Sequence, residues 1–254
     1  MQRSPTNNIF FNLISLSNIL FVFLFVVLSY YNRIASDDFY SIALLRDKGI
    51  LGGVTYTYNT WTGRWAACFL NLFLIRFYAL NHFLFVYGIT IFILFVFSVK
   101  RLLHNLIELF QVNSLSFWKE LNLAVFIVSA IFYCSIKIDE TWFFLSSTCV
   151  YLISMLFFML GTSALIARKT GVFNTLILII SFAYIGGSCE PFALINLLFL
   201  MLLIFLNDFA VLKIDLPKKQ FAKSLILAFV ICMASFVILY MADGNRVREQ
   251  FLKT

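Results

Sequence analysis

Two adjacent carboxylates follow the first long apolar run of the chain, in the stretch Ser36-Asp37-Asp38. Ionisable side chains at the edge of a membrane are energetically costly, which makes them candidates for function. The structural alternative is that Ser36 caps a short helix ending near Gly49, whose dipole stabilises both acids in its first turn. Capping needs only one short polar residue, so it leaves the second aspartate unexplained.

A guanidinium beside a glycine is the second candidate for chemistry, in the stretch YNTWTGRW that ends at Trp65. An arginine pairs with a phosphate through two parallel hydrogen bonds, and a glycine such as Gly63 lets the backbone approach a ligand closely. Alternatively, Trp61 and Trp65 belong to the belt of aromatic residues at a membrane surface, and Arg64 reaches water from there. The sequence supports both interpretations equally.

Three further stretches place charged residues beside apolar runs. Glu140 lies in KIDETWFF, at the start of one run. Glu190 precedes a proline at a predicted helix start, and Gly186–Gly187 before it would permit a tight turn facing a ligand. Arg246 and Arg248 follow the turn signal Asp-Gly-Asn in ADGNRVRE. Helix capping, helix dipoles and lipid head groups explain each stretch when it is taken singly.

Composition indicates which elements must position these residues. The chain has 254 residues, of which 62% are hydrophobic and 12% charged, and its mean hydropathy is +0.95. Because a soluble domain carries about 25% charged residues, we expect an all-α polytopic membrane protein with one integral membrane domain, 1–254. The net charge of +7 is interpreted as the excess of Lys and Arg that orients membrane helices. The hydropathy of the chain excludes a soluble protein with a nucleic-acid partner. The isolated cysteines and histidines show no metal-ligand spacing.

Seven apolar segments are predicted to cross the membrane. They are Ile9–Tyr31, Phe83–Val99, Leu121–Ile136, Trp142–Ala167, Phe173–Ile185, Phe192–Leu206 and Ala222–Met241. The basic loops Lys100–Lys119, Arg168–Lys169 and Lys213–Lys223 should face the cytoplasm, which puts the N-terminus inside and the C-terminus outside. Residues 32–82 then form an outer loop. Since this loop begins and ends outside, its short apolar segment Trp65–Leu80 is predicted to lie along the membrane surface.

The order of the charged stretches resembles a known pattern. SDDFY, WTGRW, DETWFFLSSTCVY, GGSCEPF and GNRVR follow one another along nearly the whole chain, as in the GT-C superfamily of membrane glycosyltransferases. The chain resembles in particular an uncharacterised family of bacterial multispan proteins within or beside that superfamily. In that family a proline usually precedes the glycine of the last motif, and here Asp243 stands in its place. The resemblance implies a GT-C-like helical core, with an essential acid and short interfacial helices in the first outer loop.

The resemblance also implies a reaction. A sugar would move from a polyprenyl-phosphate donor in the membrane lipid to a glycan, lipid or protein acceptor, at the outer face of a bacterial inner membrane. Asp38, and after it Asp37, would be the base that activates the acceptor hydroxyl, and direct displacement would invert the anomeric centre. Arg64, Arg248 and, third, Arg246 would bind the lipid phosphate. Many members are longer, so the chain either holds the common core or lacks a C-terminal region.

Glu190 is expected to orient the acceptor or the base, and Trp61 and Glu140 complete the predicted substrate-binding residues. The acids and the phosphate could share a divalent cation, Mg²⁺ or Mn²⁺, although the sequence offers no dedicated metal cage. Two other classes of protein stay open. A transporter or flippase of lipid-linked sugars would use the same arginines without a base. A non-catalytic membrane subunit of a cell-envelope glycan assembly would use the acids only as helix caps.

Overall fold

The computed structural model describes residues 5–79, 83–111, 115–168, 171–208 and 218–253, and within these ranges every regular element is helical. The elements are α1 (Pro5–Tyr30), α2 (Asp37–Thr60), α3 (Trp65–Leu74), the π-helical turn η1 (Ile75–Ala79), α4 (Leu84–Leu109), α5 (Phe117–Cys134), the π-helical turn η2 (Asp139–Phe143), α6 (Leu145–Val150), α7 (Leu152–Ile166), α8 (Val172–Ser188), α9 (Glu190–Asp208), α10 (Lys218–Tyr240) and α11 (Asp243–Lys253). The predicted all-helical class is confirmed for this part of the chain.

Among the described residues, six helical segments are long and apolar enough to cross a membrane. They are Phe11–Tyr30, Leu84–Leu109, Phe117–Cys134, Leu145–Ile166, Glu190–Asn207 and Gln220–Tyr240. Large apolar side chains such as Leu16, Ile93 and Val230 are exposed on them, as on a lipid-facing surface. These properties indicate an integral membrane protein. The predicted span Phe173–Ile185 corresponds to α8, which has 17 residues and is shorter than these six.

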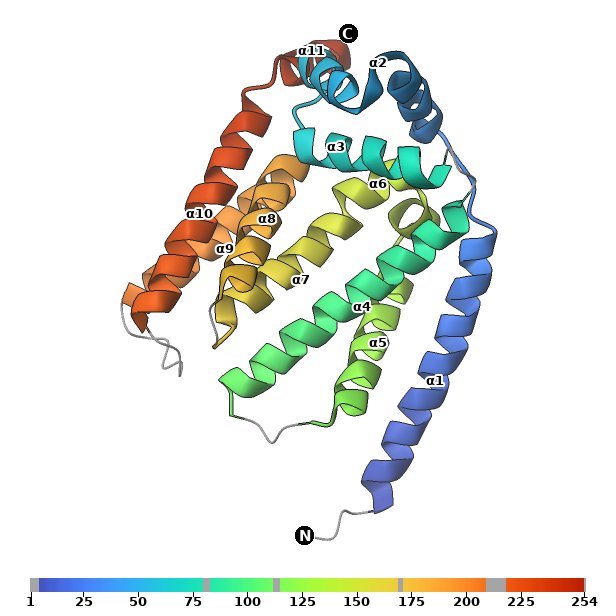
Figure 1. Ribbon diagram of the computed structural model, residues 1–254, viewed down its shortest axis with the longest axis vertical. Helices are drawn as coiled ribbons and strands as arrows, with labels where there is room; N and C mark the ends of the chain where they lie inside the picture. Colours follow the sequence, from blue (N-terminus) through green and yellow to red (C-terminus); the bar gives the residue numbers. More distant parts are fainter. Residues whose placement is uncertain (1–4, 80–82, 112–114, 169–170, 209–217, 254) are drawn as a thin grey trace.

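Helices lie across one end of the bundle and close it (Figure 1). α1, α4, α5, α7, α8, α9 and α10 run lengthwise, whereas α2 and α3 cross the bundle end and α11 packs on α2. We call this the capped end. The C-terminus lies there and the N-terminus lies at the opposite end, together with the end of α4 and the start of α5. Lys169 and Lys213 of the predicted basic loops lie outside the described residues.

The structure corrects three predicted boundaries. α4 continues through Lys100 and Arg101 to Leu109, so most of the predicted loop Lys100–Lys119 is helix; buried Glu120 of α5 pairs with Lys100 there, at 3.4 Å. The predicted span Trp142–Ala167 is broken into η2, α6 and α7 by the extended backbone of Phe144 and a turn at Tyr151. The predicted terminal turn is the helix α11, which carries an acid in its first turn and a lysine in its last, as the helix dipole favours.

An aromatic cluster holds α1, α4 and α5 together beneath the capped end. The ring of Phe25 lies 4.7 Å from that of Phe92 and 5.8 Å from that of Trp142, and Phe132 lies 5.3 Å from Trp142. Trp142 is buried and its indole N–H donates to the Ser135 hydroxyl. Edge-to-face rings of this kind add to the free energy gained by burial. The tryptophan of the DETWFF stretch is therefore a core residue.

Two glycines allow α11 to sit against the turn between α2 and α3. A Cβ atom on Gly63 would lie 1.9 Å from the Leu239 carbonyl oxygen, and one on Gly244 would lie 2.6 Å from the Trp61 nitrogen. The Gly63 N–H donates to Asn245 Oδ1 at 2.9 Å. Gly63 thus permits contact between two parts of the chain, and the close approach that the sequence suggested for a ligand is taken by the protein itself.

Replacing Gly63 tests this contact. Gly63→Ala should lower the free energy of unfolding by about 3 kcal/mol, the upper part of the range for overpacked sites, because the obstacle is backbone. Gly171→Ala is the matched control, since a Cβ there meets nothing within 4 Å. Gly171 caps the N-terminus of α8, where alanine in place of glycine should cost about 0.5–1 kcal/mol. Thermal unfolding in detergent measures both, and equal losses would contradict the assigned role.

Candidate functional site

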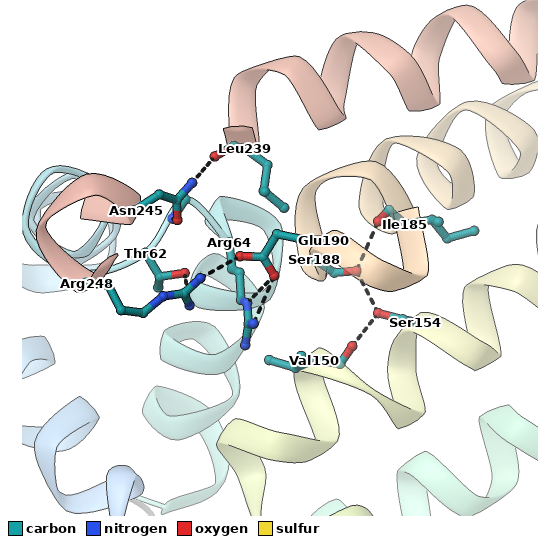
Figure 2. A network of polar contacts seen from close by, with 11 residues as sticks. Thr62, Arg64, Val150, Ser154, Ile185, Ser188, Glu190, Leu239, Asn245 and Arg248 are labelled. Carbon is teal, nitrogen blue, oxygen red and sulfur yellow. Dashed lines mark hydrogen bonds and ion pairs between the residues drawn. The ribbon is translucent and has the colours of Figure 1, made fainter. Parts of the chain in front are cut away.

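Glu190 at the capped end is held between two arginines from distant parts of the chain (Figure 2). Its Oε2 accepts a hydrogen bond from Nε of Arg64 at 2.9 Å and forms an ion pair with Nη2 of the same side chain, also at 2.9 Å. Its Oε1 accepts a hydrogen bond from Nη2 of Arg248 at 3.1 Å. Arg248 also donates to the Thr62 hydroxyl at 3.4 Å. The three side chains are 22–28% exposed. We call Arg64, Glu190 and Arg248 the ion triad; three predicted site residues thus meet.

The triad has a net charge of +1 and can receive an anion. Burial of the Arg64 guanidinium lowers its pKa, but the hydrogen bond and charge of Glu190 more than offset this, so the pKa is raised above its usual value and the group stays charged. Arg64 has five N–H donors; Nε donates to Glu190, and Nη2 is the only other nitrogen paired with that carboxylate among the described contacts. Arg64 also lines the neighbouring cavity. The remaining donors can serve a ligand there.

Hydrogen bonds join the end of α8, two residues before Glu190, to α7. The Ser188 hydroxyl lies 2.7 Å from that of Ser154, which in turn donates to the Val150 carbonyl (Figure 2). The preceding pair Gly186–Gly187 belongs to α8 and does not form the predicted turn facing a ligand. A Cβ on Gly186 would lie 2.4 Å from the Cys232 carbonyl oxygen, and one on Gly187 would lie 2.5 Å from the Trp65 ring. These glycines serve helix packing.

A cavity of about 670 Å³ opens beside the triad, between α2, α3 and α6. This volume is within the usual range for small-molecule sites. Its lining combines aromatic rings with polar groups: Tyr40, Tyr56, Trp61, Asp37, Ser41, Thr57, Thr60, Thr62, Arg64, Asn71 and Ser146, with apolar side chains between them. The three rings are 40–54% exposed. Such a lining suits a ligand that has both flat apolar faces and hydroxyl groups.

The two aspartates occupy different environments. Asp37 is exposed and lines the cavity, whereas Asp38 is fully buried and lies outside the lining. Asp38 Oδ1 accepts two hydrogen bonds from Ser146, from its N–H at 3.1 Å and its hydroxyl at 2.8 Å. Burial raises the pKa of Asp38, and the hydrogen bonds from Ser146 oppose that rise. Ser36 makes no capping hydrogen bond with its side chain, so the capping interpretation fails for that residue.

Two predicted site residues lie apart from this group. Glu140 is exposed and pairs with Lys137 at 2.7 Å, and it does not line the cavity. Arg246 is 82% exposed and its nearest acid in the structure is Asp243, at 3.9 Å. Trp61 does line the cavity, and its ring packs edge-on against Phe251 of α11.

The structure adds residues that the sequence analysis missed. Ser146, Asn71, Tyr40 and Tyr56 line the cavity and were not among the predicted site residues, although Tyr40 and Ser146 lie within the stretches SDDFY and DETWFFLSSTCVY. A signal was present for two of them, because Asn71 and Ser146 are polar residues inside apolar runs. The described lining contains a single carboxylate, that of Asp37. A divalent cation in the cavity would therefore need oxygen ligands from a bound phosphate as well.

The comparisons with known proteins return nothing: no family model, no curated protein and no solved structure matches the chain.

The triad should stabilise the capped end. Glu190→Gln leaves two partly buried guanidinium groups facing each other, so we expect the free energy of unfolding to fall by about 2 kcal/mol, less than for a fully buried pair. Glu140→Gln is the matched control and should change little, because that pair is exposed. Thermal unfolding of both variants in detergent measures this difference. Equal losses of unfolding free energy in the two variants would show that the triad has no structural role.

Asp38 should make stability depend on pH. Its folded pKa is raised, so the folded protein binds this proton more tightly than the unfolded chain, in which an aspartate has a pKa of about 4. The free energy of unfolding should then decrease as pH rises from about 4 through the folded pKa. Asp38→Asn removes this contribution and keeps the shape. The free energy of unfolding, measured against pH, should follow different curves for the unchanged protein and for Asp38→Asn. Parallel curves would show that the pKa of Asp38 is not raised in the folded protein.

Proposed function

We propose that this protein is a GT-C-like glycosyltransferase that moves a sugar from a polyprenyl-phosphate donor to an acceptor hydroxyl. One observation carries the proposal: a guanidinium, Arg64, and a carboxylate, Asp37, lie in one cavity with three exposed aromatic rings, and buried Asp38 stands directly behind the cavity wall. The acceptor is a glycan, a lipid or a protein. Inversion follows from direct displacement.

The triad supplies the site for the departing phosphate. Negative charge grows on the lipid phosphate as its bond to the anomeric carbon breaks, and a guanidinium already in place stabilises that charge. Arg64 faces the cavity, and Arg248 stands on the other side of the same carboxylate. Glu190 keeps both arginines in position before the donor arrives. At a partly dry membrane edge this contact is stronger than it would be in water.

The aromatic rings and hydroxyls suit the sugar. The apolar faces of a pyranose ring can pack on Tyr40, Tyr56 and Trp61, while its hydroxyls need hydrogen-bond partners. Thr57, Thr60 and Asn71 line the same space and provide them. The aspartate pair supplies the base that takes the proton of the attacking hydroxyl.

The proposed topology has seven spans, namely the six long helical segments and the shorter helix α8. The N-terminus lies in the cytoplasm and the capped end lies outside. The lengthwise course of α8 and the position of the termini at opposite ends support it (Figure 1). Lys100, Arg101 and Lys119 belong to the α4 and α5 segments of the end opposite the cap, where the positive-inside rule favours cytoplasm. The membrane would be a bacterial inner membrane, with the cavity open to the donor lipid at its outer surface.

A transporter of lipid-linked sugars is less well supported. Transporter sites typically lie near the middle of the membrane, at broken helices. Here all lining residues of the cavity come from α2, α3, the turn between them, and α6, at one end of the bundle.

The test is sugar transfer by the purified protein in liposomes, with a panel of polyprenyl-phosphate-linked sugars as donors. Arg64→Gln should lower the transfer rate by about 100-fold, the usual loss for a group that stabilises transition-state charge. Arg46→Gln, an exposed arginine of α2 outside the cavity lining, is the control and should keep its rate. Movement of the donor between leaflets without transfer would favour the transporter, and inactivity of the unchanged protein with every donor would reject the proposal.

A further inference from the structure

Asp38 has no direct route to the cavity in this structure. Its side chain is fully buried. Ser146, which donates a hydrogen bond to Asp38, lines the cavity. The other carboxylate oxygen, Oδ2, is buried and has no hydrogen-bond partner among the described residues. A proton that leaves a ligand in the cavity can therefore reach Asp38 by passing through the Ser146 hydroxyl.

The hydrogen bonds around Ser146 determine how its hydroxyl is oriented. A serine hydroxyl has one hydrogen and two lone pairs. Because the Asp38 carboxylate can only accept, the hydrogen points to Asp38 Oδ1, at an O–O distance of 2.8 Å. Asn71 Nδ2 donates to Ser146 Oγ at 3.2 Å and occupies one lone pair. The second lone pair is left for a donor in the cavity that Ser146 lines.

Asn71 is itself held in place. Its Nδ2 also donates to the Ser41 hydroxyl, at 3.1 Å, so the amide links α2 to α6, and all three residues line the cavity. Ser41 lies one helical turn after Asp38 in α2, on the same side of that helix. The four side chains Asp38, Ser146, Asn71 and Ser41 therefore form one chain of hydrogen bonds.

We propose that Ser146 is a catalytic residue that receives the proton of the acceptor hydroxyl and passes its own proton to Asp38. This rests on the proposed function. In the transfer step the acceptor oxygen forms its bond to the anomeric carbon, and the bond from that carbon to the phosphate oxygen breaks with its electron pair going to the phosphate. The acceptor proton moves to Ser146 Oγ as the Ser146 proton moves to Asp38 Oδ1. Asp38 ends neutral, and later loses its proton by the same route.

The environment of Asp38 suits this task. A buried carboxylate with an unsatisfied oxygen is stabilised when it gains a proton, and burial raises its pKa toward the pH at which the protein works. Asp38 thereby acts through Ser146, whose hydroxyl it positions by accepting its hydrogen bond. Asp37 is exposed at the cavity and is free to contact sugar hydroxyls instead.

Steady-state transfer by four variants in liposomes tests the relay. Ser146→Ala should lower kcat by about 100-fold or more, within the range for loss of a general base, and leave KM within about threefold. Ser146→Thr keeps a hydroxyl and should recover most of kcat. Asp38→Asn should resemble Ser146→Ala. Ser147→Ala is the matched control on the same helix, outside the cavity lining, and should behave like the unchanged protein.

A second measurement separates proton transfer from folding. Two protons move together in the relay, so single-turnover rates of the unchanged protein in mixtures of H₂O and D₂O should depend on the deuterium fraction along a curve. A straight line, or a Ser146→Ala variant that keeps its kcat, overturns the relay while sugar transfer itself stands. A protein that transfers no sugar from any donor overturns the proposed function and the relay with it. If Ser146→Ala fails to fold, the threonine variant and the isotope curve decide.

Discussion

The capped end depends on one carboxylate placed between two guanidinium groups. Glu190 begins α9, Arg64 stands before α3, and Arg248 lies in α11, so the triad joins elements separated by more than half of the chain. Removing three charges from water is costly, and mutual attraction repays that cost only when the geometry is good. A hydrophobic contact could have joined these helices more cheaply. The proposed phosphate site gives a reason, besides stability, for retaining the charges.

The triad requires close contact between the chain segments that carry it. Gly63 and Gly244 let the turn after α2 touch the start of α11, and Gly187 leaves room for the Trp65 ring. Each of these glycines is adjacent to, or a few residues from, a member of the triad. Close backbone approach and placement of charge are thus two aspects of one arrangement. The glycines of the stretches WTGRW, GGSCEPF and GNRVR thus permit the packing that brings the two arginines to Glu190.

The sequence was sufficient for the helical class and for most of the lengthwise helices, because runs of about 20 apolar residues have few other solutions in a chain of this composition. Of the eight predicted site residues, Arg64, Glu190 and Arg248 meet, and Asp37 and Trp61 line the adjoining cavity with Arg64. Asp38 is buried behind the cavity wall, and Glu140 and Arg246 lie apart from the group. The sequence-based predictions of helix boundaries were wrong where tertiary contacts determine the local structure. The span 142–167 is broken because Trp142 and Phe143 enter the aromatic core, and the terminal segment is helical because it packs on α2. Ser146 and Asn71 were missed because a polar residue inside an apolar run can equally be a buried core residue or one that lines a cavity.

The difference between the two aspartates follows from helix geometry. Successive residues of a helix point about 100° apart, so two neighbours at the start of α2 cannot face the same surroundings. Asp37 faces water and the cavity, while Asp38 is turned into the bundle, against Ser146. Two acids in sequence thus give one carboxylate that can bind hydroxyl groups and one whose affinity for a proton is raised by burial. A helix cap would need neither of these environments, whereas the proposed acid–base reaction would use both.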